Sequence, residues 1–292
     1  MGTYSIKELE KLSGIKAHTI RIWEKRYNIT SPRRTATNIR FYSDEDLKKI
    51  INVSLLNTHG IKISKIADMS AEEISRKILD MSEAKPEADL YIDQLVVSMV
   101  DLEEGRFDKI LTTLIDRFGF IRSITEVVYP FMEKIGVLWQ TGTITPAHEH
   151  FISNLIRQKI ITSIASLPIP SKKSKKAILF LPEGELHEIG LLLFHYITRN
   201  KGFKTFYLGQ SVPQEDLKTV YKIHKPDILI TSLVSVPSPK HFEKYIHTLS
   251  QDFSDATILA SGMMLRNTAF LIPKNVKAFY RATELPALLD SI

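Results

Sequence analysis

A short polar loop between a buried strand and a helix constrains the fold of this chain more than any other stretch. Residues 177–181 form a continuous apolar run of strand length, and residues 191–197 carry apolar side chains at helical spacing. Between them lie Glu185, His187 and Gly190, in the sequence E-L-H-E-I-G. Open α/β sheets bind ligands at such strand-to-helix loops. A neutral imidazole there can ligate a metal through one nitrogen while a carboxylate holds the other, although a single loop histidine is more often a solvated surface residue.

The surrounding residues repeat this strand–helix alternation. Apolar runs predict five strands, most of them followed by a helical pattern, at residues 177–181, 204–208, 227–231, 256–260 and 276–280. Such alternation with short connections is typical of a flavodoxin-like, doubly wound parallel sheet. We therefore expect an α/β domain over residues 175–292, preceded by a linker rich in proline and lysine.

The preceding part of the chain is helical. Four apolar faces at helical spacing, separated by Gly-containing or Pro-containing joints, predict a four-helix bundle over residues 88–168. A polar stretch with a proline, residues 82–87, is expected to be the linker before it.

Residues 1–80 are expected to form a small module made mostly of helices. Ser5 can cap a first helix, with Glu8 at the reciprocal capping-box position, and Gly14 ends that helix before a second one. Two short segments around residues 33–42 then predict a wing, and acidic residues open a further helix at residues 43–46. The fold class is thus a multidomain α and α/β chain, with a winged helix-turn-helix, a bundle and a sheet.

Charge is concentrated at the N-terminal end. Residues 1–65 contain 13 lysines and arginines against 6 acidic residues, whereas the chain as a whole has a net charge of +6. A basic module on a neutral body indicates a polyanionic partner at that end. The absence of cysteine excludes disulfides, thiol catalysis and zinc–thiolate sites. With no signal-peptide pattern and no apolar run near the roughly 20 residues of a membrane span, we expect a cytoplasmic protein without membrane contact.

The N-terminal module resembles the winged helix-turn-helix of the MerR family of transcription regulators. The resemblance rests on residues 4–9 (YSIKEL), 18–24 (HTIRIWE) and 38–43 (NIRFYS), with Asn38 where the family usually has glycine. It implies that the second helix enters the major groove of an operator and that the wing contacts the flanking backbone. The residues expected to contact DNA are Lys16, His18, Thr19, Arg21, Arg33, Arg34, Arg40 and Tyr42. No long heptad repeat follows, so the family's usual coiled-coil dimer is not expected.

The loop motif resembles the D/E-x-H-x-x-G motif of cobalamin-binding domains. That family continues with S-x-L about forty residues later and with a pair of small residues further on, and the chain has Ser232, Val234, Ser261 and Gly262 at these places. The resemblance implies that His187 is the lower cobalt ligand and Glu185 its hydrogen-bond partner. Gly190, Ser261 and Gly262 would then line the channel of the nucleotide tail, and Ser232, with Thr231, would hydrogen-bond its base.

The bundle carries a second matching motif. Trp139 is followed after nine residues by Glu149 and His150, which resembles the helical cap of cobalamin-binding photoreceptor repressors, the CarH-type members of the MerR family. In that type these residues cover the upper, adenosyl face of the cofactor. Two departures are visible: Gln140 replaces a histidine of the light-sensing members, with His148 and His150 nearby in sequence, and Ser261 replaces the first glycine of the small-residue pair.

These resemblances imply a regulator, rather than an enzyme, that binds adenosylcobalamin. It would be a repressor whose homo-oligomeric state, dimer or tetramer, and affinity for a double-stranded DNA operator depend on the cofactor and on light. Two other hypotheses remain open. In one, a MerR-type regulator works without a cofactor and uses the α/β domain to contact a regulatory protein partner. In the other, the chain is a corrinoid methyl carrier or a mutase subunit.

Overall fold

The computed structural model describes residues 4–35, 38–58, 60–84, 88–140, 144–234, 239–262, 265 and 271–292. It forms two compact units, Met1–Leu155 and Ile156–Ile292. The boundary falls inside helix α10 (Pro146–Ala165), so the start of this helix belongs to the first unit and its remainder to the second. Within the described parts of the chain, no helix is long and apolar enough to cross a membrane.

The first unit begins with the predicted helix-turn-helix. Helix α1 (Ile6–Ser13) has the expected capping box, in which the Ser5 hydroxyl accepts the Glu8 N–H and the Glu8 carboxylate accepts the Ser5 N–H. Gly14, in the left-handed conformation, ends α1, and α2 (Ala17–Tyr27) follows. Helix α2 buries Ile20 and Trp23, as its spacing predicted.

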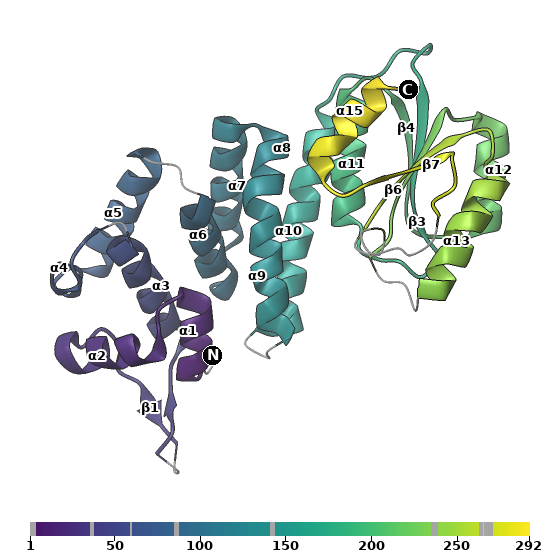
Figure 1. Cartoon of the computed structure of the whole chain (residues 1–292). Coiled ribbons are helices and arrows are strands. Elements are labelled where there is room, and N and C mark those ends of the chain that lie inside the picture. The colour runs from purple at the N-terminus through teal and green to yellow at the C-terminus, as the bar shows by residue number, and fades with distance from the viewer. Residues whose placement is uncertain are drawn as a thin grey trace. The chain divides into compact units, whose positions relative to one another are not determined.

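A small antiparallel hairpin forms the wing beside these helices (Figure 1). Strands β1 (Arg33–Arg34) and β2 (Arg40–Phe41) pair in register, and a backbone bridge joins Tyr42 to Tyr4. Three further helices complete this part of the unit: α3 (Asp44–Thr58), α4 (Ile63–Ala67) and α5 (Ala71–Ala84). Helix α5 includes residues 82–84, which the sequence had suggested as linker; residues 85–87 lie outside the described residues.

The bundle follows with helices α6 (Ala88–Val100), α7 (Glu104–Phe118), a third helical run and α10. The third run joins α8 (Phe120–Ser123), a π-helical turn (Ile124–Val128) and α9 (Tyr129–Gln140). Pro130 has no N–H to donate and its ring crowds the carbonyl of residue 126, which accounts for the wider turn at this point. The prediction of four helices is therefore confirmed.

The second unit contains a five-stranded, fully parallel sheet in the order β4-β3-β5-β6-β7. This is the flavodoxin-like order predicted from the sequence. The strands are β3 (Lys176–Pro182), β4 (Lys204–Val212), β5 (Ile228–Ser232), β6 (Thr257–Ser261) and β7 (Val276–Phe279).

Helices cover both faces of this sheet (Figure 1). Helix α11 (Ile189–Asn200) contacts β3, β4 and β5 and packs against α15 (Leu285–Asp290), which follows a 3-10 turn (Ala282–Glu284). Helices α12 (Gln214–His224) and α13 (Pro239–Asp252) lie on the other face, where their apolar side chains join the strands in one buried core. The buried central strands place the carboxyl ends of β3, β5 and β6 along one edge of the sheet.

One strand is longer than its sequence indicated. Strand β4 continues beyond residue 208 through a register shift at Gly209, which has a φ of +79°. The shift is a bulge that bends the strand end toward the loop after β3. There the Ser211 hydroxyl accepts the Gly184 N–H at 3.0 Å, and the Ser211 N–H donates to the Glu185 carbonyl at 3.1 Å.

Candidate functional site

The carboxylate of Glu185 organises the loop after β3. Its side chain is 3% exposed, and its Oε1 accepts the backbone N–H groups of Leu186 and His187, each at 3.0 Å. Its Oε2 accepts the N–H of Val234, at 2.9 Å, from the loop after β5. A buried carboxylate is stable only with such partners, so the charge holds together two loops that are 49 residues apart in sequence. They meet between β3 and β5, the point where the strand order reverses.

His187 is oriented by the same carboxylate. Its Nδ1 lies 2.6 Å from Glu185 Oε1, while its side chain remains 62% exposed. An ionised carboxylate only accepts hydrogen bonds, so Nδ1 carries a proton, and in the tautomer this contact selects the lone pair is on Nε2. This is the histidine–carboxylate pair that the sequence suggested, and it leaves Nε2 outside the carboxylate contact.

Small and hydroxyl residues line the neighbouring strand ends. Thr231, Ser232 and Ser261 are buried at the ends of β5 and β6, and the Leu233 N–H donates to the Ser261 carbonyl at 2.8 Å. Within the described residues, the Thr231 hydroxyl is buried without a hydrogen-bond partner. A buried hydroxyl in this condition indicates a partner that the chain itself does not provide.

The backbone conformation at position 262 and the close approach of a neighbouring strand end require a glycine there. Gly262 has a φ of +135°, and an added Cβ would lie 2.0 Å from the carbonyl oxygen of Leu233. Any side chain here would push apart the ends of β5 and β6. Gly190 lies in the first turn of α11, and Val234 is exposed beside Glu185.

A set of contacts that the sequence did not suggest lies next to this loop. Glu188, at the N-cap position of α11, accepts a hydrogen bond from the Tyr207 hydroxyl at 3.1 Å and pairs with Arg157 of α10 at 2.7 Å. Burial, reinforced by the Glu188 charge and hydrogen bond, raises the pKa of Tyr207 well above its usual range. The only sequence signal was an acid beside His187, since its partners lie 19 and 31 residues away along the chain.

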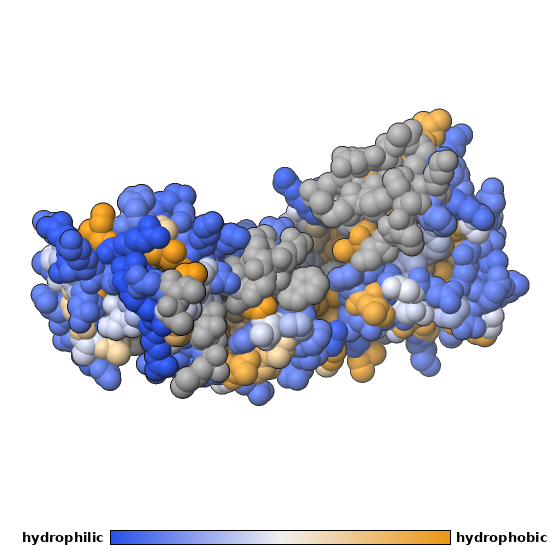
Figure 2. Space-filling view, turned by 90° about the horizontal axis from the view of Figure 1, so that it is seen from below, coloured by the Kyte–Doolittle hydropathy of each residue, from blue (hydrophilic) through white to orange (hydrophobic). Residues whose placement is uncertain are grey.

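Exposed apolar residues accompany this edge of the sheet. Leu186 and Val234 present large exposed side chains in the two loops, and Leu271 is exposed where the described chain resumes after β6. Seen from below the view of Figure 1, hydrophobic patches are exposed on the surface of the second unit (Figure 2). Exposed apolar surface at the ends of parallel strands is typical of a surface that a ligand or partner covers.

The expected cap residues lie in the first unit. Glu149 and His150 begin α10, and Glu149 Oε2 lies 2.9 Å from His150 Nδ1. Trp139 and Gln140 end α9, and their side chains lie outside what the structure describes. His148 turns back to the Thr145 hydroxyl, with 2.8 Å between Nδ1 and Oγ1.

The helix-turn-helix module presents most of its predicted DNA-contacting residues at the surface. His18, Arg21, Arg33 and Arg34 are exposed and Thr19 is partly exposed. Lys16, also exposed, pairs with Glu10 at 3.1 Å. In the wing, Arg34 Nη1 donates to the Asn38 side-chain oxygen at 2.7 Å, and Asn38 has the left-handed backbone expected of a glycine substitute.

Tyr42 was wrongly predicted to contact DNA. It is completely buried, and its hydroxyl lies 3.2 Å from the carboxylate of Glu24 on α2. The same carboxylate pairs with Arg40 at 3.0 Å, so Tyr42 and Arg40 fasten the wing to α2. Burial, followed by the Glu24 charge, raises the pKa of Tyr42 above its usual range. Tyr42 directly follows the two-residue strand β2, and so short an element gives no periodicity from which burial could have been predicted.

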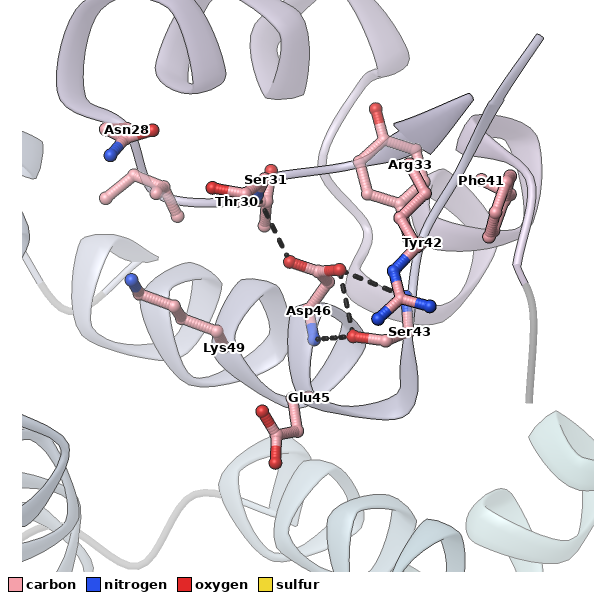
Figure 3. A pocket seen from close by; sticks show the side chains of 11 residues that line it. Asn28, Thr30, Ser31, Arg33, Phe41, Tyr42, Ser43, Glu45, Asp46 and Lys49 are labelled. Atoms are coloured by element: carbon pink, nitrogen blue, oxygen red, sulfur yellow. Dashed lines mark hydrogen bonds between the residues drawn. The ribbon is translucent and has the colours of Figure 1, made fainter. Parts of the chain in front are cut away.

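A hollow of about 470 Å³ lies in the same module between the end of α2, the wing and the start of α3 (Figure 3). Asp46 lies in it and accepts hydrogen bonds from the Ser31 and Ser43 N–H groups, at 3.3 and 3.0 Å. Arg33 and Lys49 bring positive charge to the lining, and Glu45 brings negative charge. These contacts anchor the base of the wing to the first turn of α3.

Comparisons with known proteins agree with both parts of the chain. Residues 4–73 match the MerR HTH family regulatory protein model, and residues 91–162 match the model described as a B12 binding domain. The HTH-type transcriptional repressor CarH of Myxococcus xanthus is 28% identical over 255 residues, which is 85% of each chain. The repressor CarA of the same organism is 25% identical over 269 residues, covering 90% of this chain and 88% of that one.

A solved structure shares the fold. The monomethylamine corrinoid protein of Methanosarcina barkeri superimposes with a TM-score of 0.57 at 17% identity, over 70% of this chain and 100% of that chain. At this identity the likeness concerns the fold alone. The helix-turn-helix match, the B12-binding match and the two repressors agree: the chain is a DNA-binding transcription regulator in which a B12-binding domain follows a MerR-type module, and it is similar to the CarH and CarA repressors.

Proposed function

We propose that this regulator is a repressor controlled by adenosylcobalamin and light. In darkness the cofactor would hold the bundle and the sheet domain together, and the resulting homo-oligomer would present several helix-turn-helix modules to one operator. Linked modules bind DNA more tightly because each bound module raises the effective concentration of the next. The domain limits that we propose are 1–80, 88–168 and 175–292.

The pair formed by His187 and Glu185 carries this proposal. Its Nε2 is the ligand nitrogen, and the buried carboxylate keeps the ring in that tautomer. Within the described residues, no group of three or more histidine, cysteine or acidic side chains could hold a metal ion. His187 would hold the cobalt ion of a corrinoid through this nitrogen, and the corrin ring would supply further ligands. When bound, adenosylcobalamin supplies a cobalt–carbon bond that light can break.

The polar groups at the strand ends also fit a corrinoid tail. The unpartnered Thr231 hydroxyl offers a hydrogen bond to a buried base, with Ser232 beside it in sequence. We assign Ser261, Gly262 and Gly190 to the path of the tail, and Val234 to its wall. Trp139, Glu149 and His150 are assigned to the upper face by their resemblance to the cap motif.

The contact between Glu188 and Arg157 suggests how the site is coupled to the bundle. Glu188 follows His187 directly, and Arg157 belongs to the same helix, α10, that begins with the proposed cap residues. Movement of the His187 loop therefore acts on the helix that leads into the bundle. The Tyr207 hydroxyl of β4 also donates a hydrogen bond to Glu188, which fixes the position of the carboxylate that pairs with Arg157.

An absorption spectrum tests the proposal. Full-length protein is mixed with adenosylcobalamin in darkness, desalted, measured, illuminated and measured again, with DNA binding and mass determined in both states. We expect a retained corrin spectrum that changes on illumination, together with loss of the dark oligomer and of tight DNA binding. His187→Ala should lose the retained spectrum. His224→Gln should keep it, because His224 lies at the end of α12 and stacks on Phe206.

One observation favours a second candidate, a regulator that works without cofactor. The Leu233 carbonyl already requires a glycine at position 262, and Ser261 stands where the cobalamin-binding family has a glycine, so these small residues do not by themselves demand a tail. The α/β domain would then contact a regulatory protein. A protein that stays colourless after desalting, yet binds its operator, would favour this candidate.

A further inference from the structure

An isoleucine occupies the centre of the outward face of α2. Helix α2 buries Ile20 and Trp23 against the module, whereas Ile22 is 47% exposed. At about 100° per residue, Ile22 lies roughly 200° around the helix from Ile20, on the side opposite to the core. Its side chain therefore contributes little to packing within the module.

The neighbours of Ile22 on this face are polar or cationic. His18 lies one turn before it, Lys25 and Arg26 lie one turn after it, and Arg21 lies beside it; all four are exposed. A β-branched residue is also a weaker helix former than the lysine or arginine that would suit such a surface. A single exposed aliphatic residue needs no explanation on an arbitrary surface. On the face that a helix-turn-helix presents to DNA, it does.

The major groove offers one apolar group for such a side chain to meet. Each base-pair edge there presents hydrogen-bond donors and acceptors, and only thymine adds a methyl group, at C5. We propose that Ile22 recognises a thymine methyl group in the operator and sets sequence preference at that position. The inference rests on DNA binding through α2 and adds a specificity determinant outside the set expected from the sequence.

The surrounding side chains suit a division of roles. Cationic groups such as Lys25 and Arg26 neutralise phosphates and contribute to affinity for any sequence. Ile22 carries no charge, so its contact contributes to preference without changing the number of phosphates neutralised. Loss of Ile22 should therefore alter sequence selection and leave the salt dependence of binding unchanged.

The experiment selects operators from a random duplex pool with the full-length wild-type protein in its DNA-binding state. Each conserved thymine of the selected site is then replaced by deoxyuridine, which lacks only the methyl group. For the wild type we expect one thymine per half-site at which this replacement weakens binding roughly fourfold, the value of one buried methyl group. Ile22→Ser should bind the thymine and deoxyuridine sites equally, and Ile22→Val should retain most of the difference.

A matched control comes from the second unit. Ile223 is likewise an exposed helical isoleucine, 69% exposed on α12, and Ile223→Ser should behave as the wild type. Circular dichroism and the salt dependence of non-specific binding verify that Ile22→Ser is folded. The inference is overturned if no thymine methyl affects wild-type binding, or if Ile22→Ser keeps the discrimination. If the wild type selects no sequence at all, the proposed DNA recognition by this chain is wrong. If it selects a site but no thymine methyl group matters, only the role of Ile22 is wrong.

Discussion

Replacing Glu185 by glutamine tests whether one carboxylate joins the two loops at the strand ends. The carboxylate accepts N–H groups at both oxygens: Leu186 and His187 at Oε1, and Val234 at Oε2. An amide accepts at only one of its two ends. In its better orientation Glu185→Gln keeps the Oε1 partners and turns its NH2 group toward the Val234 N–H, so two donors face each other.

The structure sets the size of the effect. At least one backbone N–H is left without an acceptor in a region that is partly buried, which costs about 2 kcal/mol. Opening of the loop after β5 then becomes roughly 30 times more frequent. The weakened hold on the His187 ring should also reduce corrinoid affinity by about 10-fold to 100-fold.

Hydrogen exchange measured by mass spectrometry is the assay, because it reports on peptides that contain residues 185–188 and 232–234 separately. Glu183→Gln is the matched control, since Glu183 is exposed in the same loop. We expect faster exchange in the peptide containing residues 232–234 for Glu185→Gln, and no change in either peptide for Glu183→Gln. Unchanged protection around residue 234 in Glu185→Gln would refute the assignment of this carboxylate as the link between the loops.

Three further predictions concern other parts of the molecule. Gly262→Ala should lower the free energy of unfolding by about 3 kcal/mol or more, because the added Cβ cannot fit beside the neighbouring strand end. Gly105→Ala is the control, since Gly105 lies at an open helical position where alanine should be neutral or stabilising. Thermal unfolding of the two variants compares these effects. Desolvation, followed by the nearby Arg199 charge, lowers the pKa of His195 to about 4, so the unfolded chain takes up a proton first and stability falls as pH drops from about 6.5 to 4. In His195→Phe this part of the pH dependence should disappear, and unfolding that stays equally pH-dependent would contradict the assignment. Arg34→Gln should weaken binding to all DNA sequences and reduce the slope of log affinity against log salt by about 1, measured by fluorescence anisotropy; a change at a single base position instead would mean that Arg34 contacts a base.

Local patterns were sufficient to predict most elements of the fold. The capping box of Ser5 and Glu8 and the apolar run at residues 177–181 predicted the starts of α1 and β3 within a residue or two. The pairing of His187 with Glu185 was also accessible, because a spacing of two residues in a tight loop leaves the side chains few alternatives.

Contacts between distant residues depended on the tertiary structure. The bulge at Gly209 brings β4 to the His187 loop, and the Val234 N–H reaches Glu185 from 49 residues away. Tyr42 differs from its prediction for the same reason, since its burial comes from packing between the wing and α2, and the two-residue strand before it is too short to show any periodicity. Hydrophobic periodicity follows from the geometry of a single helix or strand, so the sequence by itself determined which segments are helices and strands and which loop holds the histidine. Only the tertiary structure decided which buried charges share partners, because that depends on which elements the folded chain brings together.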